Sequence, residues 1–237
     1  MNTPHRKNGF TLVELLVVIT IIAVLAGIVL TVTRKVRTSA SKVADMQRLR
    51  SLSTATMAAG ADNAGRLPSL HSGSYAPYWL VSRSILETYG ITKEGCYAPT
   101  RNITGGWPDY KWWYMDATGT PVHYVYFAND GSTKTNSWFS QGSVSKPDKK
   151  EYRGGIPYDE IIQDKTKAFA RGITDDAWYP VLWAGLCRDY GGTRVGAITE
   201  NGDVLGLNVI YLDSHAEWIP MNKMKVRYTS GSLGLLW

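Results

Sequence analysis

Histidine and cysteine, on which much enzyme chemistry depends, are scarce in this chain. Its 237 residues include four histidines and two cysteines. No histidine lies in a His-Glu-x-x-His pattern, no serine lies in a Gly-x-Ser-x-Gly pattern, and no glycine-rich phosphate loop follows an apolar strand. The sequence therefore argues against zinc peptidases, serine hydrolases and P-loop enzymes, and we expect a protein that is not an enzyme.

Charge is almost absent from residues 10–32, where Glu14 is the only charged side chain. At about 1.5 Å per helical residue, this run is long enough to cross a hydrocarbon core of roughly 30 Å. A carboxylate at the centre of a membrane helix costs about 2.5–3.5 kcal/mol, whereas the positive end of the helix dipole favours one. The sequence predicts a membrane-spanning helix with its single acid near the N-terminal end.

A small residue, Gly9, stands before this apolar run, whereas the cleavage site of an ordinary secretory signal follows its apolar core. The string Gly-Phe-Thr-Leu-Val-Glu, after a short basic leader, resembles the type IV prepilin family, which includes the pseudopilins of type II secretion. The resemblance implies that a prepilin peptidase cuts between Gly9 and Phe10, removes residues 1–9, and methylates the new amine of Phe10.

The resemblance also implies how copies of the chain assemble. The carboxylate of Glu14 would meet the Phe10 amine of a neighbouring pilin-like subunit, and inner-membrane machinery would extrude the subunits. The function implied is that of a structural subunit of a type IV pilus or a type II secretion pseudopilus. The alternative is a membrane-anchored envelope protein whose head binds a ligand such as a glycan. Type IV pilus and type II secretion remain open alternatives, as do major and minor subunits.

The charges that flank the apolar run give conflicting indications of topology. Arg6 and Lys7 favour a cytoplasmic N-terminus, whereas Arg34, Lys35 and Arg37 follow the run on the opposite side. A long C-terminal domain translocates largely regardless of charge, and the peptidase faces the cytoplasm in the family. We therefore expect a single-pass inner-membrane protein with its N-terminus in the cytoplasm and its head outside.

The helix is expected to continue beyond the membrane. No proline occurs between Arg34 and Ala64, and stop signals gather from Gly60 to Pro68. Apolar residues recur at helical spacing and predict one buried stripe, formed by Val36, Val43, Met46, Leu49, Leu52 and Met57. The predicted segments are a leader (1–9), a membrane helix (10–32), its amphipathic continuation (33–64) and a globular head (65–237).

The expected fold class is α+β and pilin-like, with the long helix packed on a mainly antiparallel β head. Asp213 and Ser214 separate the last two predicted strands, so these strands are expected to form a tight hairpin. Residues 129–156 read as a polar loop. Helices are predicted at 77–89 and 158–171, and strands at 121–128, 179–184, 207–212 and 215–219.

The C-terminal string DVLGLNVIYLDSHAEWIP carries a second resemblance. It is similar to the end of large-headed pilin-like proteins, in which a His and then nine further residues precede Asp-Gly-His-Val. Here Asp203 stands in place of that first His, Ser214 in place of the Gly and Ala216 in place of the Val. The hairpin is compatible with these changes.

Asp213 and His215 are expected on one side of this hairpin and, with Asp203 or Asp189, offer ligands for a hard cation, so calcium is a candidate ligand. The alternative is ordinary turn chemistry, in which Asp bonds to nearby backbone and His pairs across strands. Cys96 and Cys187 lie in the part expected outside the cytoplasm, where one disulfide is a reasonable expectation. Two buried thiols are the alternative.

Aromatic residues are abundant in the head, and Trp107, Trp113 and Trp138 lie in polar stretches. Such residues suit the stacking of sugars, although tryptophan more often packs in a core. The net charge of +6 belongs largely to the leader and to the helix after the apolar run. The head is near neutral, so we expect no nucleic-acid partner.

Overall fold

The structure is a computed structural model of the 237-residue chain. Two compact units make up the chain, Met1–Ala40 and Ser41–Trp237. The structure describes residues 11–68, 81, 83–96, 124–128, 143–144, 170–175, 181–185, 187–190, 193–196, 198–200, 203–230 and 233–236.

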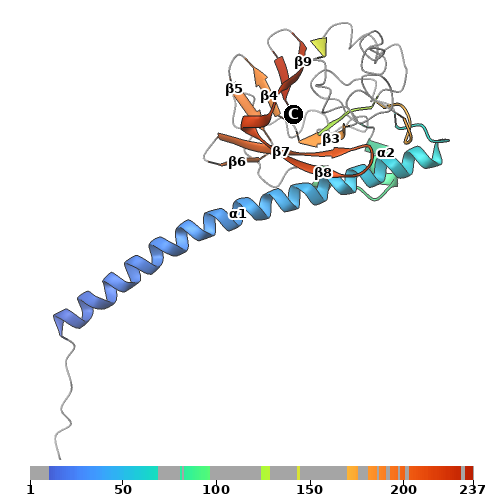
Figure 1. Ribbon diagram of the computed structural model, residues 1–237. Coiled ribbons are helices and arrows are strands. Elements are labelled where there is room, and N and C mark those ends of the chain that lie inside the picture. Colours follow the sequence, from blue (N-terminus) through green and yellow to red (C-terminus); the bar gives the residue numbers. More distant parts are fainter. Residues whose placement is uncertain are drawn as a thin grey trace, which may run out of the picture. The chain divides into compact units, whose positions relative to one another are not determined.

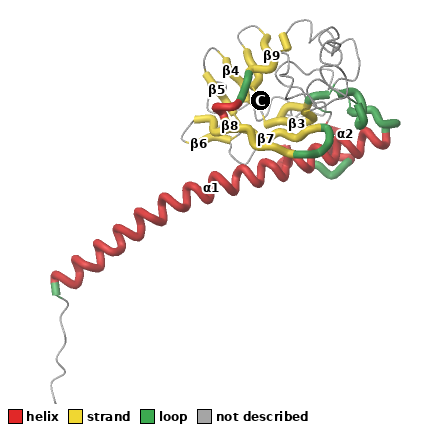
Figure 2. The backbone as a smooth tube through the Cα atoms, viewed as in Figure 1, coloured by secondary structure: helices red, strands yellow, loops and turns green. Residues whose placement is uncertain are grey.

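One long helix, α1 (Leu12–Asp62), confirms the predicted continuation beyond the apolar run. Figure 2 shows it as an uninterrupted coil. The helix ends where the stop signals predict, since Ala64 and Gly65 have φ angles of 53° and 80° and the Gly65 N–H donates to the Gly60 carbonyl at 2.8 Å. Gly60 itself lies inside the helix and is buried. A Cβ at this position would lie 2.7 Å from Cγ2 of Ile173, so the glycine permits a close approach of the two segments.

An antiparallel sheet forms the centre of the head and confirms the expected α+β class (Figure 1). Its central strand, β7 (Asp203–Tyr211), pairs with three others, and each predicted strand overlaps an observed one. The strands in this sheet are β1 (Tyr124–Tyr126), β3 (Val181–Gly185), β6 (Ile198–Glu200), β7 and β8 (Ala216–Pro220).

A second antiparallel sheet, absent from the sequence prediction, lies in the same unit. Its strands are only two to five residues long, and such short runs give a weak strand signal in sequence. One of them, at Ser143–Val144, lies inside the predicted polar loop 129–156. A polar segment can still form a strand, because strands pair through backbone groups. The order is β2 (Ser143–Val144), β9 (Val226–Ser230), β10 (Leu233–Leu236), β4 (Cys187–Tyr190) and β5 (Thr193–Gly196).

The predicted hairpin of β7 and β8 is confirmed, with a loop one residue longer than expected. Strand pairing extends to Ile210 and Ala216, and the Tyr211 N–H donates to the His215 carbonyl at 3.0 Å. Ser214 has a φ of 67°, the left-handed conformation that closes a three-residue hairpin loop. Leu212 thus belongs to the turn and not to the strand.

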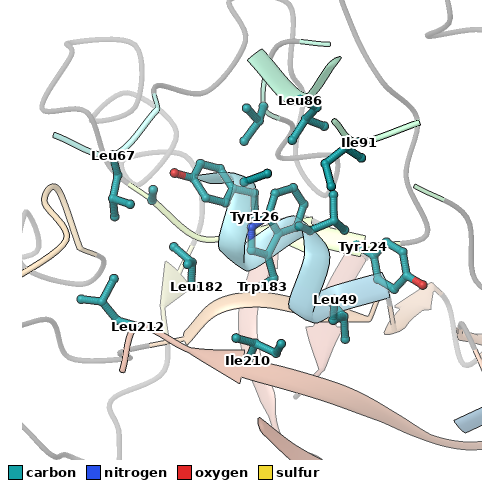
Figure 3. Packing of buried hydrophobic residues seen from close by; sticks show 14 of the residues in the cluster. Leu49, Leu67, Leu86, Ile91, Tyr124, Tyr126, Leu182, Trp183, Ile210 and Leu212 are labelled. Atoms are coloured by element: carbon teal, nitrogen blue, oxygen red, sulfur yellow. The ribbon is translucent and has the colours of Figure 1, made fainter. Parts of the chain in front are cut away.

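The hydrophobic core lies between the second half of α1 and the first sheet. Figure 3 shows Leu49 of the helix near Trp183, with Tyr124 and Tyr126 on either side of the indole ring. The Tyr126 and Trp183 rings lie 4.8 Å apart on paired strands. Aromatic side chains therefore fill the space between the helix and the sheet, the core role that the sequence analysis left open.

The predicted apolar stripe on α1 is only partly correct. Leu49 and Leu52 are fully buried, and Met46 and Met57 pack against the core. Val36 and Val43 are 60% and 62% exposed, because the face of α1 that meets the sheet lies on the opposite side of the helix from these valines. Polar and small residues occupy the remaining buried positions of α1, namely Asp45, Ser53, Ala55, Thr56, Ala59 and Gly60.

Short helices complete the described part. Within the predicted helix 77–89, α2 covers Arg83–Thr88. The predicted helix 158–171 lies outside the described residues except at its last two positions, where Ala170 forms a parallel bridge with Ala128. The described residues also include the 3₁₀ turns η1 (Lys93–Cys96) and η3 (Met221–Lys223).

Replacement of Gly206 tests how tightly β7 and β8 pack. A Cβ at this position would overlap the Trp218 ring and lie 2.5 Å from the Ile219 carbonyl oxygen. Gly206→Ala is therefore expected to lower the free energy of unfolding by about 1–3 kcal/mol, the usual cost of overpacking. Denaturant titration of the full chain in detergent measures this change. Gly95→Ala is the control, since its Cβ would meet only Ile91 Cγ2 at 3.5 Å; equal effects would contradict the packing.

Candidate functional site

The start of α1 holds Glu14 in a capping box. The Glu14 Oε2 atom accepts hydrogen bonds from the Thr11 N–H at 2.9 Å and from the Thr11 hydroxyl at 2.8 Å. In return, the Glu14 N–H donates to the Thr11 hydroxyl oxygen at 3.3 Å. These reciprocal bonds satisfy backbone groups at the helix start and fix the carboxylate on the first turn. Glu14 remains exposed. The predicted processing residues, Gly9 and Phe10, lie outside the described part.

The helix from Leu12 to Val32 presents apolar side chains in every direction. Its large hydrophobic residues are 45–81% exposed, and α1 alone among the described helices is long and apolar enough to cross a membrane. The hydroxyls of Thr20 and Thr31 donate to the helix's own carbonyls, those of Val17 and Gly27, at 2.7 and 2.9 Å. These polar groups need no partner in lipid. The helix is therefore a single membrane-spanning segment.

A buried polar cluster joins the second half of α1 to the sheet. Asp45, on α1, is fully buried. Its Oδ1 atom accepts a hydrogen bond from the Tyr124 hydroxyl at 2.8 Å, and its Oδ2 atom accepts one from Asn208 Nδ2 at 2.7 Å. The same Asn208 nitrogen donates to the Lys42 carbonyl at 3.0 Å. One carboxylate thus links the helix to both β1 and β7, and it sets the register of the helix on the head.

Burial dominates the electrostatics of this cluster. Loss of solvent raises the pKa of Asp45, and the bonds from Asn208 and Tyr124 and the charge of Arg48 oppose that rise. Burial and the neighbouring carboxylate raise the pKa of Tyr124 as well, so its hydroxyl stays protonated and acts as a donor. Because the folded chain binds a proton at Asp45 more readily than the unfolded chain does, acidification favours the fold through this group.

Three further contacts hold the helix on the head. The Trp183 Nε1–H donates to the buried Thr56 hydroxyl at 3.2 Å. The Lys42 Nζ atom lies 4.1 Å from the centroid of the Trp218 ring, within the range of a cation–π interaction. At the end of α1, the Tyr89 hydroxyl donates to Asp62 at 2.7 Å. The contacts follow one face of α1 from Lys42 to Asp62, so the head is attached along this whole stretch.

The hairpin pair proposed as calcium ligands is engaged internally. His215 Nδ1 lies 2.5 Å from Asp213 Oδ1, and the His215 ring stacks on the Tyr211 ring at 4.0 Å. The same Asp213 oxygen accepts the His215 N–H at 3.1 Å, the turn chemistry that was the alternative. The described residues contain no group of three or more His, Cys, Asp or Glu side chains suited to a metal ion. Calcium binding here stays a prediction.

The two cysteines are buried thiols in the structure. Cys96 belongs to the core, and its Sγ atom lies 3.6 Å from the Thr92 carbonyl oxygen. Cys187 opens strand β4, opposite Gly196. Their pairing in an oxidised chain stays a prediction that intact mass with and without reductant tests. The glycan candidates Trp107, Trp113 and Trp138 lie outside the described residues.

Substitution of Tyr124 tests the contribution of the Asp45 cluster. Tyr124→Phe keeps the ring and removes one donor to a buried carboxylate, so unfolding is expected to become easier by about 1.5–3 kcal/mol. Tyr126→Phe is the matched control, since its hydroxyl donates to a neutral acceptor, the Pro68 carbonyl, at 3.1 Å. Denaturant titration at pH 7 compares the two variants. A smaller loss in Tyr124→Phe than in Tyr126→Phe would contradict the role of the cluster.

The pH dependence of stability tests the burial of Asp45. The ordinary pKa of Asp is about 3.9, and the folded value lies above it. The stability that protonation of Asp45 supplies is complete below that ordinary value and is lost as the pH rises through the folded pKa. Relative to Asp45→Asn, the wild-type chain is therefore expected to gain stability on acidification. Melting temperatures at a series of pH values measure this difference, and a difference that does not vary with pH counts against it.

Comparison with known proteins bears on the N-terminal segment. Neither a curated protein nor a solved structure matches the chain. Residues 4–30 match the model of a family described as Prokaryotic N-terminal methylation motif. The match includes Gly9, Phe10 and Glu14 and most of the membrane-spanning segment, and it confirms the resemblance given by the first residues of the chain. The protein therefore carries a prepilin-type N-terminal methylation motif at the start of its membrane helix.

Proposed function

We propose that the protein is a structural subunit of a type IV pilus or a type II secretion pseudopilus. A prepilin peptidase cuts after Gly9 and methylates the amine of Phe10, and inner-membrane machinery then assembles the subunit with other pilin-like subunits through α1. The observation that carries the proposal is the methylation motif at residues 4–30, joined to an apolar helix whose first turn presents an exposed carboxylate.

The environment of Glu14 supports an intersubunit role. Only one of its carboxylate oxygens, Oε2, accepts the bonds from Thr11. Within the described residues the other oxygen accepts no bond, and in a membrane little water would be available to solvate it. A cationic amine from a neighbouring copy, that of Phe10, satisfies this need, and it fixes the axial offset between the two helices. The capping box holds the carboxylate in place for that contact.

The second half of α1 supports separate roles for the helix in assembly and for the head at the surface. Its contacts with β1, β3, β7 and β8 make the helix part of the head's core, so force applied to the helix acts on the head directly. The head would then be exported with the helix as one body and would supply the outer surface of the assembly. The orientation proposed is N-terminus in the cytoplasm and head outside the inner membrane.

Two substitutions separate the charge of Glu14 from its capping role. Glu14→Gln keeps the acceptor that the Thr11 N–H requires and loses the negative charge, because Gln also serves in a capping box. Thr11→Ala removes the hydroxyl and leaves the charge. We expect Glu14→Gln to be cleaved normally and to fall at least about tenfold in sheared filaments, the cost of one buried charge-assisted contact. Thr11→Ala keeps the charge and the backbone N–H that bonds to Glu14, so it is expected to lose less than Glu14→Gln.

Quantitative mass spectrometry of sheared filaments and of membranes measures both the cleavage of each variant and its amount in filaments. Wild-type amounts of Glu14→Gln in filaments would contradict the proposed contact. Processed wild-type protein that stays in membranes, together with retention of the head on a glycan array, would favour the alternative, an envelope protein that uses the leader for targeting only.

A further inference from the structure

Three basic residues follow the apolar run directly. Arg34, Lys35 and Arg37 begin two positions after Val32, and all three are exposed. We call these three residues the basic collar. No acidic residue lies between Glu14 and Asp45 in the sequence, and Asp45 is buried within its own cluster. The positive charge of the collar is therefore not neutralised by any acid of this stretch of helix.

The helical rise places the collar at headgroup depth. At about 1.5 Å per residue, Arg34 and Arg37 lie roughly 3 and 7.5 Å beyond Val32 along the axis. The polar layer on each side of a hydrocarbon core is about 5–8 Å thick. Thr33 is the last hydroxyl residue before the collar, and its hydroxyl donates to the Val29 carbonyl at 2.7 Å. After Glu14, the collar therefore holds the first charged side chains of the helix, and these need polar partners from outside it.

The directions of the three side chains indicate the kind of partner. Successive helical residues are turned by about 100°, so the collar spreads over nearly half of the helix circumference. Side chains so spread cannot close around one small anion, whereas a layer of lipid phosphates surrounds the helix and meets all of them. Guanidinium groups bind phosphate oxygens in pairs, and each basic residue adds to attraction by an anionic surface.

We propose that the basic collar binds the phosphates of anionic lipids at the C-terminal end of the membrane span. This interaction fixes the depth of α1 in the bilayer and holds the subunit among anionic lipids before it leaves the membrane. It goes beyond the assembly function, and it holds for either orientation of the chain, because the collar lies at a membrane surface in both.

Native mass spectrometry of the full chain in nonionic detergent tests the proposal. The probe is an equimolar mixture of phosphatidylglycerol and phosphatidylcholine with the same acyl chains. The wild-type chain is expected to retain the anionic lipid preferentially. The triple substitution Arg34→Gln, Lys35→Gln, Arg37→Gln is expected to reduce this preference by on the order of fivefold for each charge removed. Unchanged preference in this variant would overturn the proposal.

A matched variant removes three exposed charges elsewhere, with Arg50→Gln, Arg171→Gln and Lys223→Gln. It is expected to keep the preference, and an equal loss would show that only net charge matters and would overturn the proposal. Exchange of Arg and Lys within the collar is expected to keep the preference for the anionic lipid. Loss of the preference in that variant would contradict binding through positive charge. Inorganic phosphate at millimolar concentration is expected not to displace the lipid, and displacement would indicate a soluble-anion site instead.

Discussion

One helix must be compatible with two environments, a lipid bilayer along its first half and a protein core along its second, and most features of this structure follow from that constraint. From Leu12 to Val32, α1 exposes apolar side chains in all directions, and its threonine hydroxyls bond to its own carbonyls. From Lys42 to Asp62, the same helix buries one face in a protein core, and its polar groups find partners on the head. The two halves of the helix differ in their side chains, while the backbone stays helical throughout.

The acidic residues of α1 show how these environments differ. Asp45 accepts hydrogen bonds from two residues of the sheet. Asp62, the last residue of the helix, accepts one from the Tyr89 hydroxyl. Both acids are thus engaged within the head. In the described part of the chain, Glu14 bonds only to its own capping residue, Thr11, and its side chain is exposed. Under the proposed function, it is the acid of this helix that would meet a partner from another subunit.

The sequence was sufficient for the parts that depend on local pattern. Uninterrupted apolar residues predicted the membrane span, and strong alternation or β-branched and aromatic runs predicted β1, β3, β7 and β8. The second sheet was missed because its strands are only two to five residues long and pair through backbone groups. Val36 and Val43 were misassigned because helical spacing alone does not say which face meets a sheet.

The polar cluster around Asp45 was also missed, and for a physical reason. An aspartate on an amphipathic helix reads as a solvent-facing residue, and only the folded arrangement brings Tyr124 and Asn208 to it from distant strands. The Thr11–Glu14 capping box, in contrast, had a signal in the Thr-x-x-Glu spacing ahead of an apolar run. Local bonds of this kind are readable from sequence, whereas long-range polar pairs are not.

The most direct measurement is mass spectrometry of the N-terminal peptide in filaments sheared from cells that express the chain. We expect a peptide that begins at Phe10, carries a methylated amine, and is enriched in the sheared filaments or, for a pseudopilin, in the assembled pseudopilus. A chain that keeps residues 1–9 and remains in the membrane would contradict this expectation.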